Sequence, residues 1–436
     1  MPPQPPSAAS RDEPVIRDRG DACPGALRLH AADDGHLARV RIPGGLLTTR
    51  QASTLGLAAD RFGDGHLELT SRGNVQLRGL ADDCGAGLAR LLDGAGLLPA
   101  PSHERVRNIV ASPMGTDRVV HWVRELDRLL CASTRATALS GRFLFALDEG
   151  CGDVAALDPD VTVLARTDGR ALVRLGAAGD AVELGDSDVP QAALLAAEYF
   201  LDAADAAGTR AWRVAELPAG HATDSAEFVQ RLAAAGIDAT RVPAVEWPYA
   251  PPPEPWGPGG VGNQTPLCVL PPLGRLSTDQ WRVLVQVADR GNGELRVTPW
   301  RSIILPRAST RRPVNGYARI EAAGLVVGPD SPWRSVTACT GRPGCAKALA
   351  DVRADARAVV QQAGQAGQAG HAADALPVHW SGCARRCGHP RGTAWVDIVA
   401  TPDGYELDAQ PVPHADLAAA LTAARRPRTT TPPPTQ

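Results

Sequence analysis

The stretch PGGLLTTRQASTLGLAADRFGDGHLELTSRGNVQL, from Pro43 to Leu77, decides the fold because the chain contains it twice. The second copy, PLGRLSTDQWRVLVQVADRGNGELRVTPWRSIIL, runs from Pro272 to Leu305. With one gap, at Phe62, the copies share Pro43, Gly45, Leu47, Thr49, Gln51, Leu55, Asp60, Gly65, Leu67, Thr70 and Leu77 with Pro272, Gly274, Leu276, Thr278, Gln280, Leu284, Asp289, Gly293, Leu295, Thr298 and Leu305. Agreement at so many ordered positions indicates a duplication.

Each copy predicts a helix, a turn and a strand. Apolar residues three and four apart follow the shared glutamine, and a Gly-x-Gly break precedes alternating apolar residues such as Leu67 and Leu69 or Leu295 and Val297. Further amphipathic helices are predicted in DRVVHWVRELDRLL and QAALLAAEYFLDAA, and a hairpin with an Asp-Gly turn in VTVLARTDGRALVRLG. The class is therefore mixed α and β, in two pseudo-twofold halves.

The composition bounds the classes of function. A chain of 436 residues with 44% hydrophobic residues can bury a large core and suggests several domains. Its 45 basic and 48 acidic residues leave a net charge of -3, so no overall field attracts nucleic acid or a membrane surface. The sequence has neither a secretory signal pattern nor an apolar run long enough to span a bilayer. We therefore expect a cytoplasmic protein that binds neither nucleic acid nor membrane.

Several segments have compositions that predict no packed core. Residues 1–20 and the tail 425–436 are rich in proline and polar residues, which predicts disorder. Residues 246–265 are rich in proline and glycine and predict a linker. The low-complexity stretch QQAGQAGQAGHAADA reads as an insertion between two pairs of cysteines.

Four of the nine cysteines form two tight pairs, Cys339 with Cys345 in TACTGRPGCAKALAD and Cys383 with Cys387 in HWSGCARRCGHPRG. In a reducing compartment such pairs indicate metal binding or catalysis rather than disulfides. An iron-sulfur cluster needs four thiolates from several directions, which two short loops can supply. Structural zinc stays open as an alternative, although its pairs usually have two to four intervening residues and the first pair here has five. We expect buried thiols at the remaining cysteines, Cys23, Cys84, Cys131, Cys151 and Cys268.

Residues around the pairs suit an anionic cluster. The helix-like AKALADVRADARAVV follows Cys345 directly, so its N-terminal amides are expected to face the cluster. Gly382 and Gly388 bracket the second pair and should let backbone amides approach sulfur. Arg385 and Arg386 are expected to supply counter-charge.

The two cysteine spacings, the duplicated module and the stretch VRNIVASP resemble the siroheme-containing sulfite and nitrite reductases, over about residues 22–425. Within that superfamily TPWRSIIL, ACTGRPGCAKALAD and SGCARRCGHP look most like the precorrin-3B synthases. The resemblance implies an α+β fold with two ferredoxin-like half-domains, 21–90 and 266–328, and two lobes like the 4Fe-4S domain. It implies that lobe 91–245 lacks cluster ligands and that lobe 329–424 holds the cluster.

The resemblance also implies a reaction. It indicates an oxygen-dependent monooxygenase of aerobic cobalamin (vitamin B12) biosynthesis that converts precorrin-3A to precorrin-3B, hydroxylating the macrocycle while the ring A acetate closes a lactone. The implied cofactors are a 4Fe-4S cluster and, in addition, a mononuclear non-haem iron whose ligands the sequence does not identify. The implied electron donor is external, a ferredoxin or an NAD(P)H-dependent reductase. Two alternatives stay open: a siroheme-dependent ferredoxin sulfite or nitrite reductase, and a zinc-stabilised binding protein without catalysis.

Carried over position by position, the resemblance makes Cys339, Cys345, Cys383 and Cys387 the cluster ligands, with Cys387 nearest the tetrapyrrole. It places Arg41, Arg72, Arg107 and Arg142 where the reductases hold macrocycle carboxylates or the small anion, with Arg301 as a further carboxylate contact. A guanidinium grips a carboxylate through two charge-assisted hydrogen bonds, which suits a substrate with many acetate and propionate groups. His379 and His389, which flank the second pair, are expected to support the cluster region, and iron ligation or proton donation stays open as an alternative role. No catalytic residue is identified.

One departure from the reductase pattern bears on the reaction. Where sulfite reductases have two lysines flanking an aromatic residue, this chain has GRFLF, with Arg142 and then Leu144. A missing cation at the place where sulfite binds argues against six-electron reduction of an anion. The departure favours the oxygenase.

Overall fold

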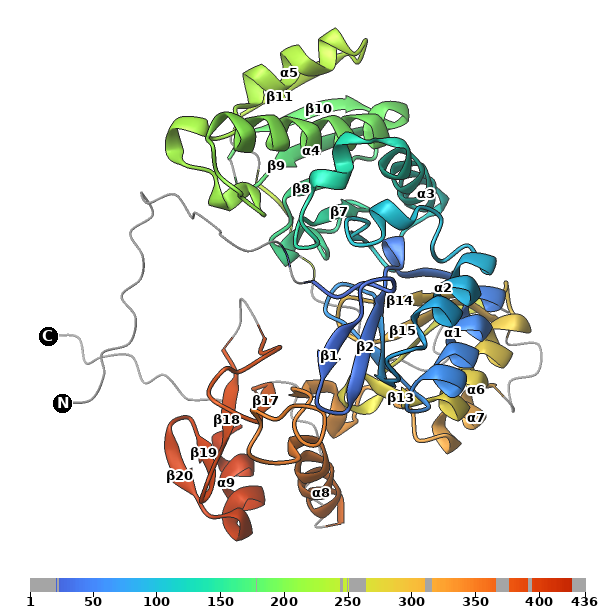
Figure 1. Ribbon diagram of the computed structural model, residues 1–436, viewed down its shortest axis with the longest axis vertical. Helices are drawn as coiled ribbons and strands as arrows, with labels where there is room; N and C mark the ends of the chain where they lie inside the picture. Colours follow the sequence, from blue (N-terminus) through green and yellow to red (C-terminus); the bar gives the residue numbers. More distant parts are fainter. Residues whose placement is uncertain are drawn as a thin grey trace, which may run out of the picture.

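The computed structural model describes residues 21, 23–177, 179–243, 246–248, 250, 264–309, 316–365, 376–390 and 394–425. The ends 1–20 and 426–436, most of the predicted linker (251–263) and part of the predicted insertion (366–375) lie outside the described residues. The described part of the chain forms four β-sheets. In Figure 1 the half-domains, blue and yellow, lie beside one lobe drawn in green and a second drawn in orange and red.

The two ferredoxin-like halves exchange strands. One sheet has the order β1-β2-β5-β4-β13 and the other β12-β15-β14-β3. Strand β3 of the first copy therefore pairs with β14 of the second, and β13 of the second pairs with β4 of the first. The strands are β1 (His30–Ala32), β2 (Gly35–Val40), β3 (Leu46–Thr48), β4 (His66–Leu69), β5 (Val75–Leu80), β12 (Gln264–Val269), β13 (Arg275–Ser277), β14 (Glu294–Val297) and β15 (Ile303–Ser309). Because of the exchange, the two halves form one structural unit with a shared core.

Helices α1 (Thr49–Phe62) and α6 (Thr278–Asp289) cover this unit and confirm the helix predicted in each copy. Each begins with a capping box, from Thr48 to Gln51 in α1 and from Ser277 to Gln280 in α6. The helices pack against one another, and the indole Nε1 of Trp281 donates to the Ala52 carbonyl at 2.6 Å. Shorter helices α2 (Gly85–Gly94) and α7 (Gly316–Ala322) lie beside them.

The two lobes repeat one sheet pattern. The first has the order β11-β10-β9-β8-β7-β6 and the second β16-β17-β18-β19-β20, each with three parallel strands followed by antiparallel ones. The strands are β6 (Ile109–Ala111), β7 (Phe145–Asp148), β8 (Val161–Ala165), β9 (Arg170–Leu175), β10 (Ala181–Gly185), β11 (Ala239–Val242), β16 (Val336–Ala338), β17 (Val378–Ser381), β18 (Val396–Thr401), β19 (Gly404–Leu407) and β20 (Gln410–Val412). Their helices are α3 (Asp117–Ala132), α4 (Val189–Ala206), α5 (Ser225–Ala234), α8 (Val352–Gln365) and α9 (Leu417–Ala424). The repetition agrees with the predicted mixed α and β class in pseudo-twofold halves.

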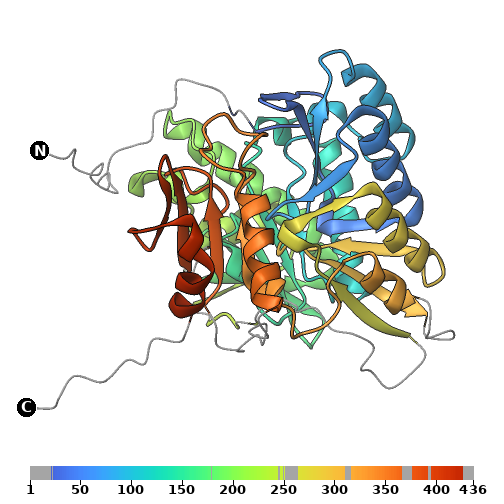
Figure 2. The ribbon, with the colours of Figure 1, turned by 90° about the horizontal axis from the view of Figure 1, so that it is seen from below.

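The predicted amphipathic helices correspond to α3 and α4, and the predicted hairpin to β8 and β9. The helix expected directly after Cys345 is wrong in its start, because α8 begins at Val352. The intervening amides serve tertiary contacts instead: Ala346 N donates to Asp33, and Leu349 N donates to the Gly382 carbonyl at 2.8 Å. Figure 2 shows α8, in orange, between the second lobe's sheet and the half-domains.

Among the described residues, no helix combines the length and the apolar character needed to cross a membrane.

Candidate functional site

The two cysteine pairs lie on loops at one edge of the second lobe's sheet. Strands β16 and β17 are parallel neighbours, so the loops that follow them leave the sheet on the same side. Cys339 comes directly after β16, and Cys383 comes two residues after the end of β17. The Gly382 amide donates to Cys339 Sγ at 3.1 Å, which confirms the expected approach of an amide to sulfur. This contact and the hydrogen bond from Leu349 N to the Gly382 carbonyl join the two loops.

The spacing of the four thiols suits a group larger than one metal ion. Burial raises the pKa of the Cys387 thiol, and the other three cysteines of the set raise it further, so all four are close enough to interact. Yet no three of these sulfurs, all in the described part of the chain, lie within 4.8 Å of one another. Tetrahedral zinc, with Zn–S bonds of about 2.3 Å, would bring its sulfurs to about 3.8 Å. The arrangement fits a cluster of several atoms better than it fits zinc.

His379 contacts the backbone of the second cysteine loop. It is fully buried, its Nδ1 lies 2.8 Å from the Thr337 hydroxyl, and its Nε2 lies 3.1 Å from the Cys387 carbonyl. Burial, with a contribution from Arg301, lowers the pKa of His379 to about 4. The ring is therefore neutral at pH 7 and donates a single proton to one of these oxygens. His389 is exposed and stacks on Trp395 at 5.4 Å.

The first cysteine loop is anchored on the ferredoxin-like unit. Arg78 forms a two-point ion pair with Asp34 at 2.8 and 2.7 Å and also donates to the Gly344 carbonyl at 2.7 Å. The amide of Ala346 donates to Asp33. These contacts fix the loop that carries Cys345 against the turn between β1 and β2.

Only one of the two arginines expected to balance the charge of the cluster, Arg385, is free of an internal ion pair in the described structure. Arg386 is directed to Asp397, with which it forms an ion pair. Arg385 is exposed and slightly offsets the rise in the pKa of Cys387.

The remaining cysteines do not all lie in the core. Cys84 and Cys268 are buried as expected, but Cys23 and Cys131 are only partly buried and Cys151 is exposed, so the expectation is wrong for Cys151. The ligand atoms of Cys151, Asp148 and Asp153 lie within 4.8 Å of one another.

This Asp-Cys-Asp group is a poor candidate for the non-haem iron. Both oxygens of Asp148 already accept two backbone amides each, at distances of 2.8 to 3.1 Å. Asp153 accepts from the Ser112 hydroxyl at 2.6 Å. Because these bonds hold the loop in place, we assign no iron here.

Arg41 and Arg72 form the centre of a crowded group of arginines. Arg41 is only 3% exposed, and its Nη1 has no hydrogen-bond partner in the described structure. Burial and the neighbouring Arg39 lower the pKa of Arg41 to about 9. Burial, followed by Arg213, lowers the pKa of Arg72 to about 10. Guanidinium groups that are desolvated and repel one another would be stabilised by a bound anion.

The structure brings Arg142 to this group through its backbone. Arg72 donates to the Gly141 and Arg142 carbonyls at 3.0 and 2.9 Å. The guanidinium of Arg142 is exposed and lies over the Trp212 ring at 4.8 Å. Arg72 is thus fixed in position, and Arg142 extends from the loop that fixes it.

Arg107 lies in a different setting. Its guanidinium donates to both oxygens of Asp127, at 2.6 and 2.7 Å, and to the Leu97 carbonyl at 3.3 Å. An internal carboxylate therefore occupies the two-point fork that a substrate carboxylate would need. We leave Arg107 out of the proposed substrate contacts for this reason.

Arg301 lies at the second cysteine loop. Its backbone is left-handed, with φ of 59°. A Cβ built on Gly388 would lie 3.2 Å from its Nη2, so the guanidinium lies directly beside this glycine. Burial and the neighbouring Arg353 lower the pKa of Arg301. The second repeat thus contributes a guanidinium next to the loop of Cys387.

Arg39 is a site residue that the sequence analysis missed. Arg39, Gln76 and Glu68 face one another across β2, β5 and β4. Arg39 donates to Gln76 at 3.1 Å, and Gln76 donates to Glu68 at 3.1 Å. Glu68 forms an ion pair with Arg353, whose Nε donates to the Cys339 carbonyl at 3.2 Å. A chain of polar contacts therefore links the arginine group to a proposed cluster ligand.

The position of Leu144 is apolar and closed. Leu144 is 4% exposed and packs with Val110, Ala146 and Val154, and Trp300 lies against this group. The backbone amide of Leu144 donates to Asp160 at 2.9 Å. The structure therefore contains a hydrophobic wall where the reductase pattern has a cation.

Together, the exchanged half-domains and the paired lobes define the class: the chain has the nitrite/sulfite reductase fold. The family described as "Nitrite/Sulfite reductase ferredoxin-like half domain" matches residues 30–92 and 263–311, which contain the two copies of the repeat. The structure of the NirA protein of Mycobacterium tuberculosis matches with a TM-score of 0.63 and 19% identity, over 85% of this chain and 73% of that one.

Sequence comparison identifies particular relatives of the chain. The chain is 26% identical over 417 residues to a precorrin-3B synthase of Sinorhizobium sp, covering 90% of this chain and 83% of the relative. It is also 26% identical over 391 residues to a ferredoxin–nitrite reductase of Synechococcus elongatus, covering 81% and 74%. The resemblance to the sulfite and nitrite reductases and to the precorrin-3B synthases is confirmed, and the chain is a relative of both.

Proposed function

We propose that the protein is a precorrin-3B synthase-like monooxygenase, which takes precorrin-3A, dioxygen and electrons from an external donor to the hydroxylated ring A lactone. One observation carries the proposal: four thiols that lie close enough to interact share the molecule with buried and partly buried arginines that lack ion-pair partners. Among the described residues, no carboxylate lies within ion-pair distance of Arg41, Arg72 or Arg301. A polycarboxylate macrocycle would supply the missing anions.

In this proposal the arginines bind and orient the substrate. Arg41 and Arg72 would each receive a substrate carboxylate in a dry environment, where a charge-assisted hydrogen bond is stronger than in water. Arg301 would receive a carboxylate near the loop of Cys387. The wall of Leu144 and Trp300 would cover an apolar face of the macrocycle and exclude water from it.

The four cysteines fit a 4Fe-4S cluster by their donor set, by their loops leaving the sheet on the same side, and by the Gly382 amide aimed at sulfur. When bound, such a cluster supplies one-electron transfer or an anchoring iron. The residues around it hold its loops: His379 fixes the carbonyl of Cys387, and Arg353 fixes that of Cys339. The donor of the electrons is proposed to be a ferredoxin or an NAD(P)H-dependent reductase.

The decisive test is incorporation of labelled oxygen. The anaerobically purified protein is incubated with precorrin-3A, a chemical or enzymatic reductant and ¹⁸O₂, and the product is analysed by mass spectrometry. The proposal predicts one labelled oxygen in the product. A product formed without label, or no product from cluster-loaded protein, would refute the hydroxylase assignment.

A second candidate function is siroheme-dependent reduction of nitrite or sulfite, favoured by the similarity to ferredoxin–nitrite reductases. This function requires bound siroheme and consumption of nitrite or sulfite with a reduced viologen. The side chain of Leu144 disfavours it, since it packs in an apolar cluster and carries no charge for a small anion.

A further inference from the structure

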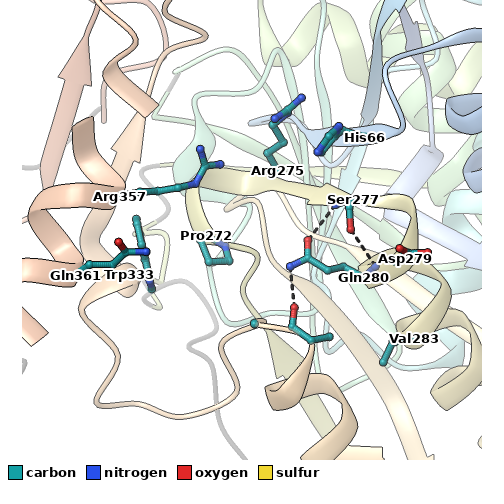
Figure 3. A pocket seen from close by; sticks show the side chains of 12 residues that line it. His66, Pro272, Arg275, Ser277, Asp279, Gln280, Val283, Trp333, Arg357 and Gln361 are labelled. Carbon is teal, nitrogen blue, oxygen red and sulfur yellow. Dashed lines mark hydrogen bonds between the residues drawn. The ribbon is translucent and has the colours of Figure 1, made fainter. Parts of the chain in front are cut away.

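A pocket of about 590 Å³ lies between the second ferredoxin-like half and the cluster lobe, away from the site proposed above. Arg357 and Gln361 enter it from the cluster lobe, and Arg275, Ser277 and Gln280 line it from the half-domain (Figure 3). None of the proposed cluster ligands or substrate-binding arginines lines this pocket. It therefore needs an explanation of its own.

Among the described arginines around the pocket, all but one form an ion pair. Arg78 pairs with Asp34, Arg353 pairs with Glu68, and Arg275 pairs with Asp64 at 2.8 Å. Asp279, which also lines the pocket, pairs with Arg282.

Arg357 is the remaining guanidinium. It is half-buried, and within the described residues no carboxylate lies within ion-pair distance of it. Burial, with Arg275 and Arg353, lowers the pKa of Arg357. Asp351 offsets part of this effect without an ion pair, so the pocket presents an arginine that has no ion-pair partner among the described residues, beside Arg275.

The pseudo-twofold repeat provides an internal comparison. The equivalent pocket in the first half measures only about 240 Å³ and is lined by Thr48 and Gln51, the counterparts of Ser277 and Gln280. There Asp127 neutralises Arg107 with two hydrogen bonds.

The helices of the two lobes can be matched through their buried positions. Val119, Val123 and Leu126 of α3 correspond in spacing to Val352, Ala356 and Val359 of α8. Arg124 of α3 lines the pocket of the first half and Arg357 of α8 lines that of the second, so the two arginines take comparable places. Arg124 pairs with Glu294 at 3.8 Å, and the repeat puts His66 at the place of Glu294. The second half therefore keeps this arginine without that carboxylate and has the larger pocket.

We propose that this pocket binds a small oxyanion, the phosphate or carboxylate group of a soluble ligand, between Arg357 and Arg275. The ligand would take the place of the carboxylate that Glu294 offers to Arg124 in the first half. The Trp333 ring, which also lines the pocket, offers an apolar wall for the rest of such a ligand. Because its two cations come from α8 and β13, a bound anion would tie the cluster lobe to the half-domain. The inference does not depend on the proposed function.

The test is isothermal titration calorimetry of the full chain at low ionic strength, with pyrophosphate in one arm and citrate in the other. We expect saturable binding in at least one arm, and the arm that binds identifies the oxyanion class. Replacing Arg357 by Gln removes a two-point charged contact and should weaken binding about tenfold or more. Arg357→Lys keeps the charge and should recover part of the affinity.

Arg124→Gln is the matched control, since it removes the arginine at the comparable place in the other lobe and should leave the affinity unchanged. The melting temperature without ligand shows whether each variant is folded. The proposal is overturned if the unchanged protein binds neither anion, or if Arg357→Gln, folded, binds as tightly as the unchanged protein does.

Discussion

Arg41, which is buried, and Arg72, which is partly buried, lie in one crowded group, and among the described residues no carboxylate lies within ion-pair distance of either. Such groups cost free energy in the empty protein and recover it when an anion binds. This free-energy cost indicates that the two arginines serve binding rather than stability. The same reasoning separates them from Arg107, which Asp127 neutralises within the fold.

Replacing Arg72 by Ala should weaken binding of the precorrin about tenfold or more, because a charge-assisted contact contributes roughly 1.5–3 kcal/mol. The measurement is a fluorescence or absorption titration under anaerobic conditions. Arg128→Ala is the control, since Arg128 lies exposed on α3 and pairs only with Glu125. If the Arg72 variant and the control bind the precorrin equally well, Arg72 has a structural role only.

Cys387→Ala should abolish both the cluster and the activity. Its thiol is the most exposed of the four, so its loss should disturb the protein fold less than loss of the others. Iron and acid-labile sulfide assays check the result, with Cys151→Ala as the control that keeps both. A Cys387 variant that retains iron, sulfide and activity would show that the proposed ligand set is incorrect.

At the scale of single elements, the strand exchange depends on tight turns. Gly45 has a φ of 68°, and a Cβ there would lie 1.9 Å from the Val297 carbonyl oxygen on β14. The close approach leaves no room for a side chain. The equivalent Gly274, with φ of 67°, shows that both copies use the same turn.

Gly45→Ala should therefore destabilise the protein by more than about 1 kcal/mol, since it adds a clash to an unfavourable φ. Thermal or urea unfolding measures the loss. Gly94→Ala is the control: Gly94 ends α2 with nothing within 4 Å of a built Cβ, so alanine should be neutral or slightly stabilising. A stability unchanged in Gly45→Ala would contradict the close approach of β3 and β14.

Glu68 couples the sheet of the first half to helix α8. Its burial would raise its pKa, but Arg353, with smaller contributions from Arg78 and Arg275, outweighs burial and leaves the pKa below its ordinary value. A carboxyl group whose pKa is lowered by folding contributes stability above the pKa of the unfolded chain. It loses that contribution as the pH falls through the folded value.

We expect Glu68→Gln to cost about 3–5 kcal/mol at pH 7, because it leaves the largely buried Arg353 without its carboxylate partner. The variant should also lose less stability than the unchanged protein when the pH falls below about 4.3. Unfolding midpoints measured from pH 7 to pH 3 check both effects. Parallel pH profiles for the two proteins would exclude Glu68 as the titrating group.

The sequence predicted the elements well because the repeat carries its own periodicity and capping residues. It did not predict the exchange of β3 and β13, since strand partners depend on contacts across more than 200 residues of chain. The start of α8 at Val352 was missed because Asp33 and the Gly382 carbonyl take up the amides that would have begun the helix earlier. Arg39 carried a signal, two residues before Arg41 on one strand, but its partner Gln76 follows only from the strand register.

At the scale of the whole molecule, the duplication produced two lobes with one sheet pattern and different loops. In the second lobe the loops after β16 and β17 carry the cysteine pairs. In the first lobe the loops after β6 and β7 are joined by the hydrogen bond from Ser112 to Asp153 at 2.6 Å. The same edge of the sheet therefore carries the proposed cluster ligands in one half and is joined by side chains in the other.

The most direct measurement of the central claim is the absorption spectrum of anaerobically purified protein, with iron, acid-labile sulfide and zinc assays and an acid-acetone extraction of tetrapyrrole. The account predicts a broad cluster absorption, iron and sulfide in equal amounts, and no extractable siroheme. Zinc without sulfide would contradict the cluster, and extracted siroheme would contradict the proposed hydroxylase in favour of a nitrite or sulfite reductase.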